Sequence, residues 1–178
     1  MKKRVILISL LIMALFFVVF LYTIVDRPNN IEEAMKEVGI EGAEVLHHQI
    51  ININKNDSVV IYKLKEMNGI RFGLVNEDRY GWKWEQHLGD IRMIGEFKNG
   101  FSSEYISLPE RNYSVIFGSI MNQELERVTV SYPFGLEKYV ELVEIDEKLT
   151  VWFTKWNFDD RRIIIKAGGK ENFINEEL

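Results

Sequence analysis

The chain has 178 residues, a formal net charge of −5 and no cysteine. The lack of cysteine excludes disulfide bonds, cysteine nucleophiles and attachment of a lipid through a thiol. About 150 residues follow an apolar N-terminal stretch, which is the size of one ordinary domain.

Residues 5–25 form an apolar run of 21 residues without a charged side chain. As a helix rising about 1.5 Å per residue, the run would span about 30 Å, the thickness of the hydrocarbon core of a bilayer. It is longer than the apolar region of a secretory signal peptide, and Tyr22-Thr23-Ile24-Val25 offers no small-x-small cleavage site. We therefore expect an uncleaved, single-pass transmembrane signal anchor.

The charges that flank this run predict its orientation. Residues 1–4 form a basic tail, whereas Asp26-Arg27 on the other side is neutral as a pair. An excess of Lys and Arg holds the N-terminal side in the cytoplasm, so we expect the C-terminal domain outside the cell membrane. With the tail set aside, 19 basic residues remain against 27 acidic ones, a net charge of −8. Such a domain repels nucleic acid, which we do not expect as a partner.

The exported part begins with a short linker, residues 26–30, which would hold the domain close to the membrane. A helix is predicted over residues 31–38, because Asn30 is a suitable N-cap and Glu33 can complete a capping box. Gly39 fits the C′ position that ends such a helix.

From Val45 onward, apolar and polar residues alternate with a period of two, and β-branched residues dominate. Asn68-Gly69 favours a two-residue type I′ hairpin turn, and residues 76–79 read as a polar turn. Arg127, Thr129 and Ser131 are expected to form the solvated face of their strand. The predicted strands cover residues 45–53, 58–67, 70–75, 91–97, 101–108, 113–121, 125–132, 139–145, 149–156 and 162–167.

Consecutive strands without intervening helices favour antiparallel sheets. We therefore predict a mainly β domain over residues 31–178, with one short N-terminal helix. An antiparallel β-sandwich is the first choice and a partly open barrel the second. No repeated segment stands out, which indicates one domain.

No motif specifies a reaction. His47 and His48 are adjacent in a predicted strand and would point to opposite faces, and His87 has no second ligand at a recognisable spacing. Neither a metal site nor a cofactor is expected. No serine nucleophile motif is present, and the carboxylates are too numerous for a glycosidase pair to be identified.

The tryptophans offer the best candidate for a binding face. Trp82 and Trp84 are two residues apart, so in a strand their rings share one face. Flat aromatic rings stack on sugars and anchor protein interfaces. The alternative is a core lined by tryptophan, which is favoured because Lys83 and Glu85 look like the solvated side of the strand. Two further tryptophans of matching parity are Trp152 and Trp156.

Several stretches carry a resemblance to a known group of proteins. Beside the lysine-rich start and the anchor they are Gly81-Trp82-Lys83-Trp84, Ile116-Phe117-Gly118-Ser119-Ile120, Val128-Thr129-Val130 and Ile163-Ile164-Ile165-Lys166-Ala167-Gly168-Gly169-Lys170. Together they resemble small uncharacterised membrane-anchored extracytoplasmic proteins of low-GC Gram-positive bacteria. The resemblance implies a β-rich domain outside the membrane and brings no catalytic residues.

These observations lead to one expected function and two alternatives. We expect a domain tethered to the bilayer through residues 5–25 that binds an envelope protein without catalysis. The first alternative is a module that binds cell-wall polysaccharide through Trp82 and Trp84. The second is an envelope hydrolase.

Overall fold

The computed structural model confirms a mainly β chain in which all strand pairs are antiparallel. The residues that the structure describes make up most of the chain. These are residues 2–25, 27–65, 67, 69–91, 100–121, 124–132, 135, 137–157, 163–169 and 173–177.

The described residues form two α-helices, two 3₁₀ turns and twelve strands, which follow one another along the chain. The helices and turns are α1 (Lys2–Val25), α2 (Ile31–Glu37), η1 (Ile53–Lys55) and η2 (Pro109–Arg111). The strands are β1 (Ala43–Asn52), β2 (Asp57–Leu64), β3 (Ile70–Asp78), β4 (Gly81–Ile91), β5 (Phe101–Leu108), β6 (Tyr113–Ile120), β7 (Arg127–Ser131), β8 (Lys138–Val140), β9 (Leu142–Asp146), β10 (Leu149–Asn157), β11 (Ile164–Gly168) and β12 (Phe173–Glu177).

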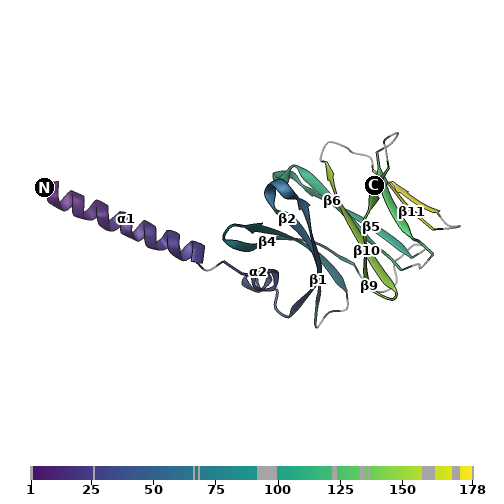
Figure 1. Cartoon of the computed structure of the whole chain (residues 1–178), viewed down its shortest axis with the longest axis horizontal. Helices are drawn as coiled ribbons and strands as arrows, with labels where there is room; N and C mark the ends of the chain where they lie inside the picture. Colours follow the sequence, from purple (N-terminus) through teal and green to yellow (C-terminus); the bar gives the residue numbers. More distant parts are fainter. Residues whose placement is uncertain are drawn as a thin grey trace.

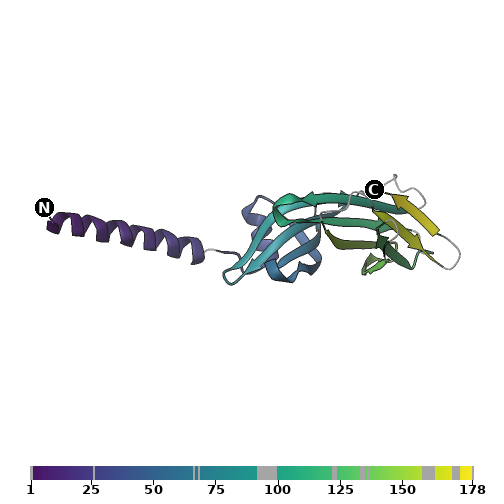
Figure 2. The ribbon, with the colours of Figure 1, turned by 90° about the horizontal axis from the view of Figure 1, so that it is seen from above.

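Helix α1 covers the predicted anchor and projects away from the sheets (Figures 1 and 2). Its side chains are described from Ile8 to Phe20, and the large apolar ones among them are 49–72% exposed. Within the described residues, no helix has both the length and the hydropathy needed to cross a membrane. The structure therefore does not support the predicted transmembrane helix.

Helix α2 forms where the capping signals predicted it. The side chain of Asn30 accepts a hydrogen bond from the backbone of Glu33 at 2.8 Å, and the Glu33 carboxylate accepts one from the backbone of Asn29. At the other end, Gly39 has φ +83°, and the N–H of Ile40 donates to the carbonyl of Met35. Both ends of this seven-residue helix are thus closed by local hydrogen bonds.

The strands form three sheets of four strands each. Sheet A has the order β1-β2-β3-β4, sheet B the order β5-β6-β10-β9, and sheet C the order β12-β11-β7-β8. Sheets A and B enclose one hydrophobic core, sheets B and C enclose a second, and α2 packs on the outer face of sheet A. The result is a stack of three sheets with sheet B in the middle, to which α2 adds a fourth layer on sheet A, rather than a two-sheet sandwich.

Strand β6 shows why the middle layer is possible. All eight of its residues are buried, because Val115 and Phe117 face sheet A while Ile116 and Ile120 face sheet C. Since side chains alternate across a strand, a strand buried on both faces reads as a continuous apolar run.

Sheets A and B meet at two similar corners. In each, a strand runs into a 3₁₀ turn, an asparagine adopts positive φ, and the next strand begins; the asparagines are Asn56 (φ 51°) and Asn112 (φ 64°). The following strands start with similar residues, Asp57-Ser58-Val59-Val60-Ile61 and Tyr113-Ser114-Val115-Ile116-Phe117. This local repetition was not recognised in the sequence, because only about five residues carry it.

The carboxylate of Asp57, which has no exposed surface, joins the two corners. It accepts hydrogen bonds from Arg111 Nη1 at 2.9 Å, Tyr113 Oη at 2.8 Å and Asn76 Nδ2 at 3.2 Å. Arg111 also pairs with Glu85 at 2.7 Å. Burial and the bond to Asp57 raise the pKa of the Tyr113 phenol, so it remains a neutral donor.

The hairpin between β2 and β3 differs in register from the prediction. A two-residue turn at Asn68-Gly69 would pair Met67 with Ile70, whereas Tyr62 pairs with Arg71, a shift of four residues. Gly69 has φ +154°, which is not a type I′ geometry, and Asn68 lies outside the described residues. A register shift by an even number of residues keeps every side chain on its face of the sheet. The alternation of apolar and polar residues therefore could not reveal this shift.

Other differences concern the lengths of strands. Residues 76–78 belong to β3 rather than to a turn, and the predicted strand 139–145 is divided between β8 in sheet C and β9 in sheet B. Thr129 and Ser131 are buried rather than solvated. The tail holds β12, and residues 92–97 of one predicted strand lie outside the described residues.

Candidate functional site

Trp82 and Trp84 lie on the outer face of sheet A, the face that α2 covers. Both rings are half-buried in the cluster formed by α2 and this face, with Ile31, Met35 and Tyr62 among its buried members. They share a face, as the spacing predicts, and neither is a fully buried core residue nor a fully exposed one.

Trp84 is held tightly against the sheet. A Cβ atom added to Gly73 would lie 2.1 Å from Cη2 of Trp84, so the ring rests directly on the glycine of the neighbouring strand. Its other neighbour is Tyr62, whose ring meets it edge-on at 5.6 Å. Trp84 is therefore fixed in position and contributes to packing.

Trp82 lies near the linker. Its backbone N–H donates to the carbonyl of Pro28 at 2.9 Å, and the ring of His48 meets the indole edge-on at 5.7 Å. The same end of the β3–β4 hairpin carries Asp78, which forms an ion pair with Arg27. The aromatic face is thus joined to the segment that leads to α1.

A chain of polar groups continues from the aromatic residues. Tyr62 Oη and His87 Nδ1 share a hydrogen bond of 3.2 Å, and His87 Nε2 lies 3.1 Å from Asp90 Oδ1. Arg71 Nε lies 3.2 Å from the same oxygen of Asp90. Burial raises the pKa of Tyr62, so its hydroxyl remains protonated.

This chain resembles a proton relay in its connectivity, but its two ends differ in access. The side chains of His87 and Asp90 are 44% and 43% exposed, whereas Tyr62 is 1% exposed. A substrate can therefore reach the imidazole and the carboxylate but not the phenol. The arrangement is suited to hydrogen bonding with a polar ligand at the surface.

Glu104 on β5 adds a second carboxyl group beside this chain. Burial raises its pKa, the charge of Asp90 raises it further, and His87 opposes the shift. Sequence reasoning missed the grouping of Arg71, His87, Asp90 and Glu104, because the residues come from three strands. The period-two pattern places each on a face but does not say which strands are neighbours.

The sequence also predicts settings for the β1 histidines and for Glu85. His47 is half-buried beside Phe153, whereas His48 is exposed on the opposite face of β1, as expected for adjacent strand residues. Glu85, expected to be solvated, pairs with Arg111 and Lys83. Within the described residues, no group of three His, Asp or Glu side chains could hold a metal ion.

Trp152 and Trp156 belong to the core between sheets B and C, where they are 0% and 5% exposed. Trp152 stacks on Phe101 at 5.7 Å with nearly parallel rings, and neither indole N–H has a hydrogen-bond partner among the described residues. The prediction of a tryptophan-lined core therefore holds for this pair.

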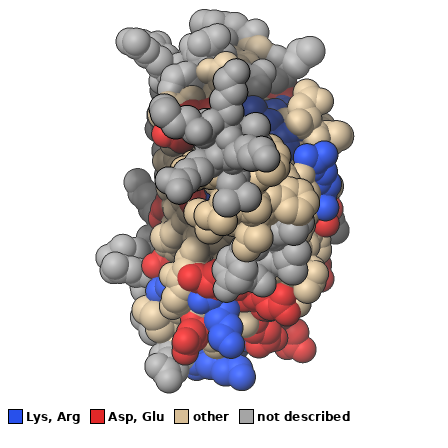
Figure 3. All heavy atoms as spheres, turned by 90° about the vertical axis from the view of Figure 1, so that its left-hand side faces the viewer, with Lys and Arg blue, Asp and Glu red and all other residues tan. Residues whose placement is uncertain are grey.

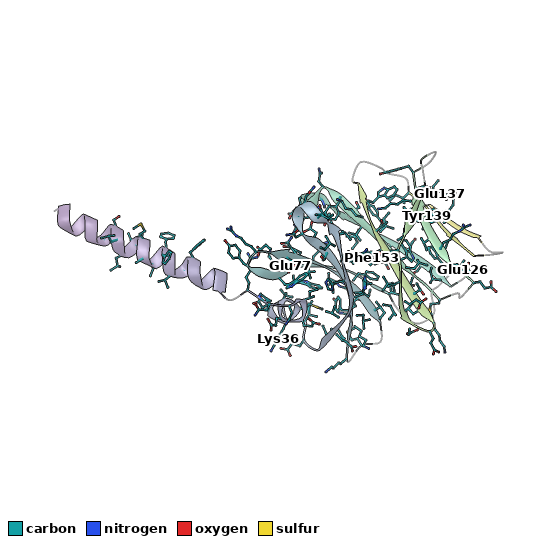
Figure 4. The ribbon with its side chains drawn as sticks, in the orientation of Figure 1. Lys36, Glu77, Glu126, Glu137, Tyr139 and Phe153 are labelled. Atoms are coloured by element: carbon teal, nitrogen blue, oxygen red, sulfur yellow. The ribbon has the colours of Figure 1, made fainter. Side chains whose placement is uncertain are left out.

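A second region of interest is a groove of about 680 Å³ beside the strands of sheet B. Its apolar residues include Ile120, Leu125 and Leu142, and its carboxylates come from the segment before β7, from β9 and from the turn after β9. Figure 4 labels one of them, Glu126, at the end of the domain far from α1.

The end of the molecule that carries α1 has a different character. Basic and acidic side chains gather together over the lower part of this face, and further charged side chains lie among uncharged ones above them (Figure 3). Comparison of the chain with protein-family models, with curated proteins and with solved structures finds no match.

Proposed function

We propose that the protein is a membrane-tethered interaction domain that binds an envelope protein and has no catalytic role of its own. The observation that carries the tether is the apolar surface of α1, whose large side chains from Ile8 to Phe20 are all well exposed. A helix that is apolar all round needs either a protein core or a bilayer around it. The sequence extends this apolar run to 21 residues, from 5 to 25, which favours the bilayer.

The connection between helix and domain supports a display role. The Arg27–Asp78 ion pair and the hydrogen bond from Trp82 to Pro28 fasten the linker to the β3–β4 hairpin. A fastened linker limits the orientations that the domain can take at the membrane. The basic residues before the run favour an N-terminus in the cytoplasm and a domain outside.

A non-catalytic role is supported by the site geometry. The hydrogen-bonded chain through His87 ends at the buried phenol of Tyr62, and the accessible groups, His87 and Asp90, already bond one another. Group transfer usually requires a nucleophile and a base that face a shared open space. The bonded pair of His87 and Asp90 is not such an arrangement.

The first experiment determines membrane association and topology with the full chain. After expression in a Gram-positive host, the protein should stay in the membrane pellet through an alkaline carbonate wash. Protease added to protoplasts should degrade the domain and leave the N-terminal end protected. Release by carbonate, or a domain that resists protease until the cells are lysed, would contradict the proposal.

The second experiment addresses the partner. Cross-linking of intact cells, followed by purification of the full chain, should give one protein in stoichiometric amount. The control is the same domain carried by an unrelated transmembrane helix, which should capture the same protein, because the domain is proposed to carry the specificity. Loss of the partner with the exchanged helix would assign binding to α1.

A second candidate function is binding of wall polysaccharide by the aromatic face. It is favoured by the half-exposed polar groups of His87 and Asp90 beside Trp82 and Trp84, since sugar hydroxyls need such donors and acceptors. Trp82→Ala should abolish retention on purified cell wall while the fold is kept. A folded variant that is retained like wild type would eliminate this candidate.

A further inference from the structure

The groove lies beside sheet B, on the side on which sheet C packs. Ile120, Thr150 and Glu144 form one row across β6, β10 and β9, and the row faces the side on which sheet C packs. Leu125 and Glu126, which precede β7, line the groove as well. The volume of about 680 Å³ is that of a small-ligand pocket or of a few side chains of a docked peptide.

The chemistry of the lining is amphipathic and acidic. Ile120 and Leu125 are 3% and 6% exposed and close the floor, so the apolar surface open to a ligand comes from the part-buried Leu142 and from Met121, which is 37% exposed. The charged members of the lining are Glu126, Glu144, Asp146, Glu147 and Lys148. Among the described residues, four carboxylates and one ammonium group line the groove and give it a net charge of −3.

We propose that this groove binds a basic, extended peptide segment of the envelope protein that the domain recognises. The inference rests on the proposed function and names the chemistry of its partner. Lysine or arginine side chains would pair with the carboxylates of Glu126 and Glu144, while the apolar side chains between them contact the accessible parts of Met121 and Leu142. In an extended chain, successive side chains point to opposite sides, so one side of the peptide carries the charged groups and the other side carries the apolar ones.

Other occupants fit the groove less well. Anionic ligands are repelled by its negative charge. A bound metal ion would need converging ligands, and within the part of the chain that is described no three His, Asp or Glu side chains converge in this way. The groove also lies at the end of the domain away from α1, as the position of Glu126 shows, which suits a protein partner better than the surface of the bilayer (Figure 4).

The test uses the full chain in non-ionic detergent micelles and a fluorescein-labelled peptide of alternating lysine and valine. Fluorescence anisotropy should show saturable binding that weakens as salt is added, because exposed charges are screened. The matched peptide of glutamate and valine, and micelles without protein, should show no binding. Failure of the lysine peptide to bind, or binding that salt does not affect, overturns the proposal.

Two double variants locate the binding. Glu126→Gln with Glu144→Gln should weaken binding about fivefold, since each exposed ion pair contributes on the order of a factor of two to five. Glu37→Gln with Glu41→Gln removes the same charge from the α2 region and should leave the affinity unchanged. Equal weakening in both variants would show that only net charge matters and would refute the groove.

Cross-linking in cells separates failure of the groove from failure of the proposed function. A photoreactive residue at Met121, beside the groove, should capture the partner, whereas one at Lys36 on α2 should not. Capture from Lys36 alone would keep the interaction domain and reject the groove. Capture from neither position, in cells where cross-linking of the whole chain also finds no partner, would reject the proposed function itself.

Discussion

Replacement of Asp57 by alanine should strongly destabilise the domain. The Asp57 carboxylate is fully buried and accepts hydrogen bonds from Arg111, Tyr113 and Asn76 across the two corners. Removing one partner of a buried ion pair typically costs about 3–5 kcal/mol. Arg111 keeps its ion pair with Glu85, so we expect the lower end, about 3 kcal/mol. For a domain of this size, that lowers the melting temperature by about 10 °C.

The measurement is chemical unfolding of the full chain in detergent, followed by tryptophan fluorescence. Asp57→Asn keeps an acceptor for the Tyr113 hydroxyl but removes the charge. Its free energy of unfolding should therefore lie between that of the wild type and that of Asp57→Ala. The control is Glu44→Ala, which removes an exposed ion pair with Lys63 and should cost no more than about 1 kcal/mol.

The reasoning fails if Asp57→Ala loses no more stability than Glu44→Ala. It also fails if Asp57→Asn is as damaging as Asp57→Ala, because the neutral hydrogen bond to Tyr113 would then contribute nothing. Either result would mean that the corners are held together by apolar packing alone.

Three further predictions follow from burial and close contacts. Because folding raises the pKa of the Tyr113 phenol, only the unfolded chain loses this proton just above pH 10. The free energy of unfolding, measured from pH 8 to 11, should therefore fall above pH 10. In Tyr113→Phe it should fall less steeply. Gly73→Ala should displace the ring of Trp84 and lower the free energy of unfolding by about 1–3 kcal/mol. The expected signs are a shift in tryptophan emission and an earlier unfolding midpoint. An unchanged spectrum would show that the ring is mobile. Trp152→Ala should cost about 3–5 kcal/mol in unfolding free energy, whereas the half-buried Trp82→Ala should cost clearly less, and equal losses would contradict the difference in burial.

The sequence predicted the local elements best where residues within one turn or one strand decide the outcome. The helix at Ile31–Glu37 depends on Asn30 and Gly39, and strand β5 occupies its predicted bounds, Phe101–Leu108. The number of sheets was not predictable in this way. Which strands become neighbours depends on contacts between residues far apart in the chain, and a period of two is compatible with a sandwich, a barrel or three layers.

The candidate site was predictable only in part. The shared face of Trp82 and Trp84 follows from their spacing, but their partial burial under α2 depends on where the helix packs. The link from Tyr62 through His87 to Asp90 needs the pairing of β2 with β3 and of β3 with β4. The groove depends on how far sheet C extends over sheet B, which no single segment encodes.

The doubly buried strand β6 has a consequence for how the domain opens. Because Phe117 belongs to one hydrophobic core and Ile116 to the other, loss of β6 disrupts both cores at once. Its amides, paired with β5 and β10 along the whole strand, should exchange with deuterium only through global unfolding. Sheet A and sheet C are therefore expected to lose structure in a single cooperative event, and fluctuations short of it should be confined to α2 and the outermost strands.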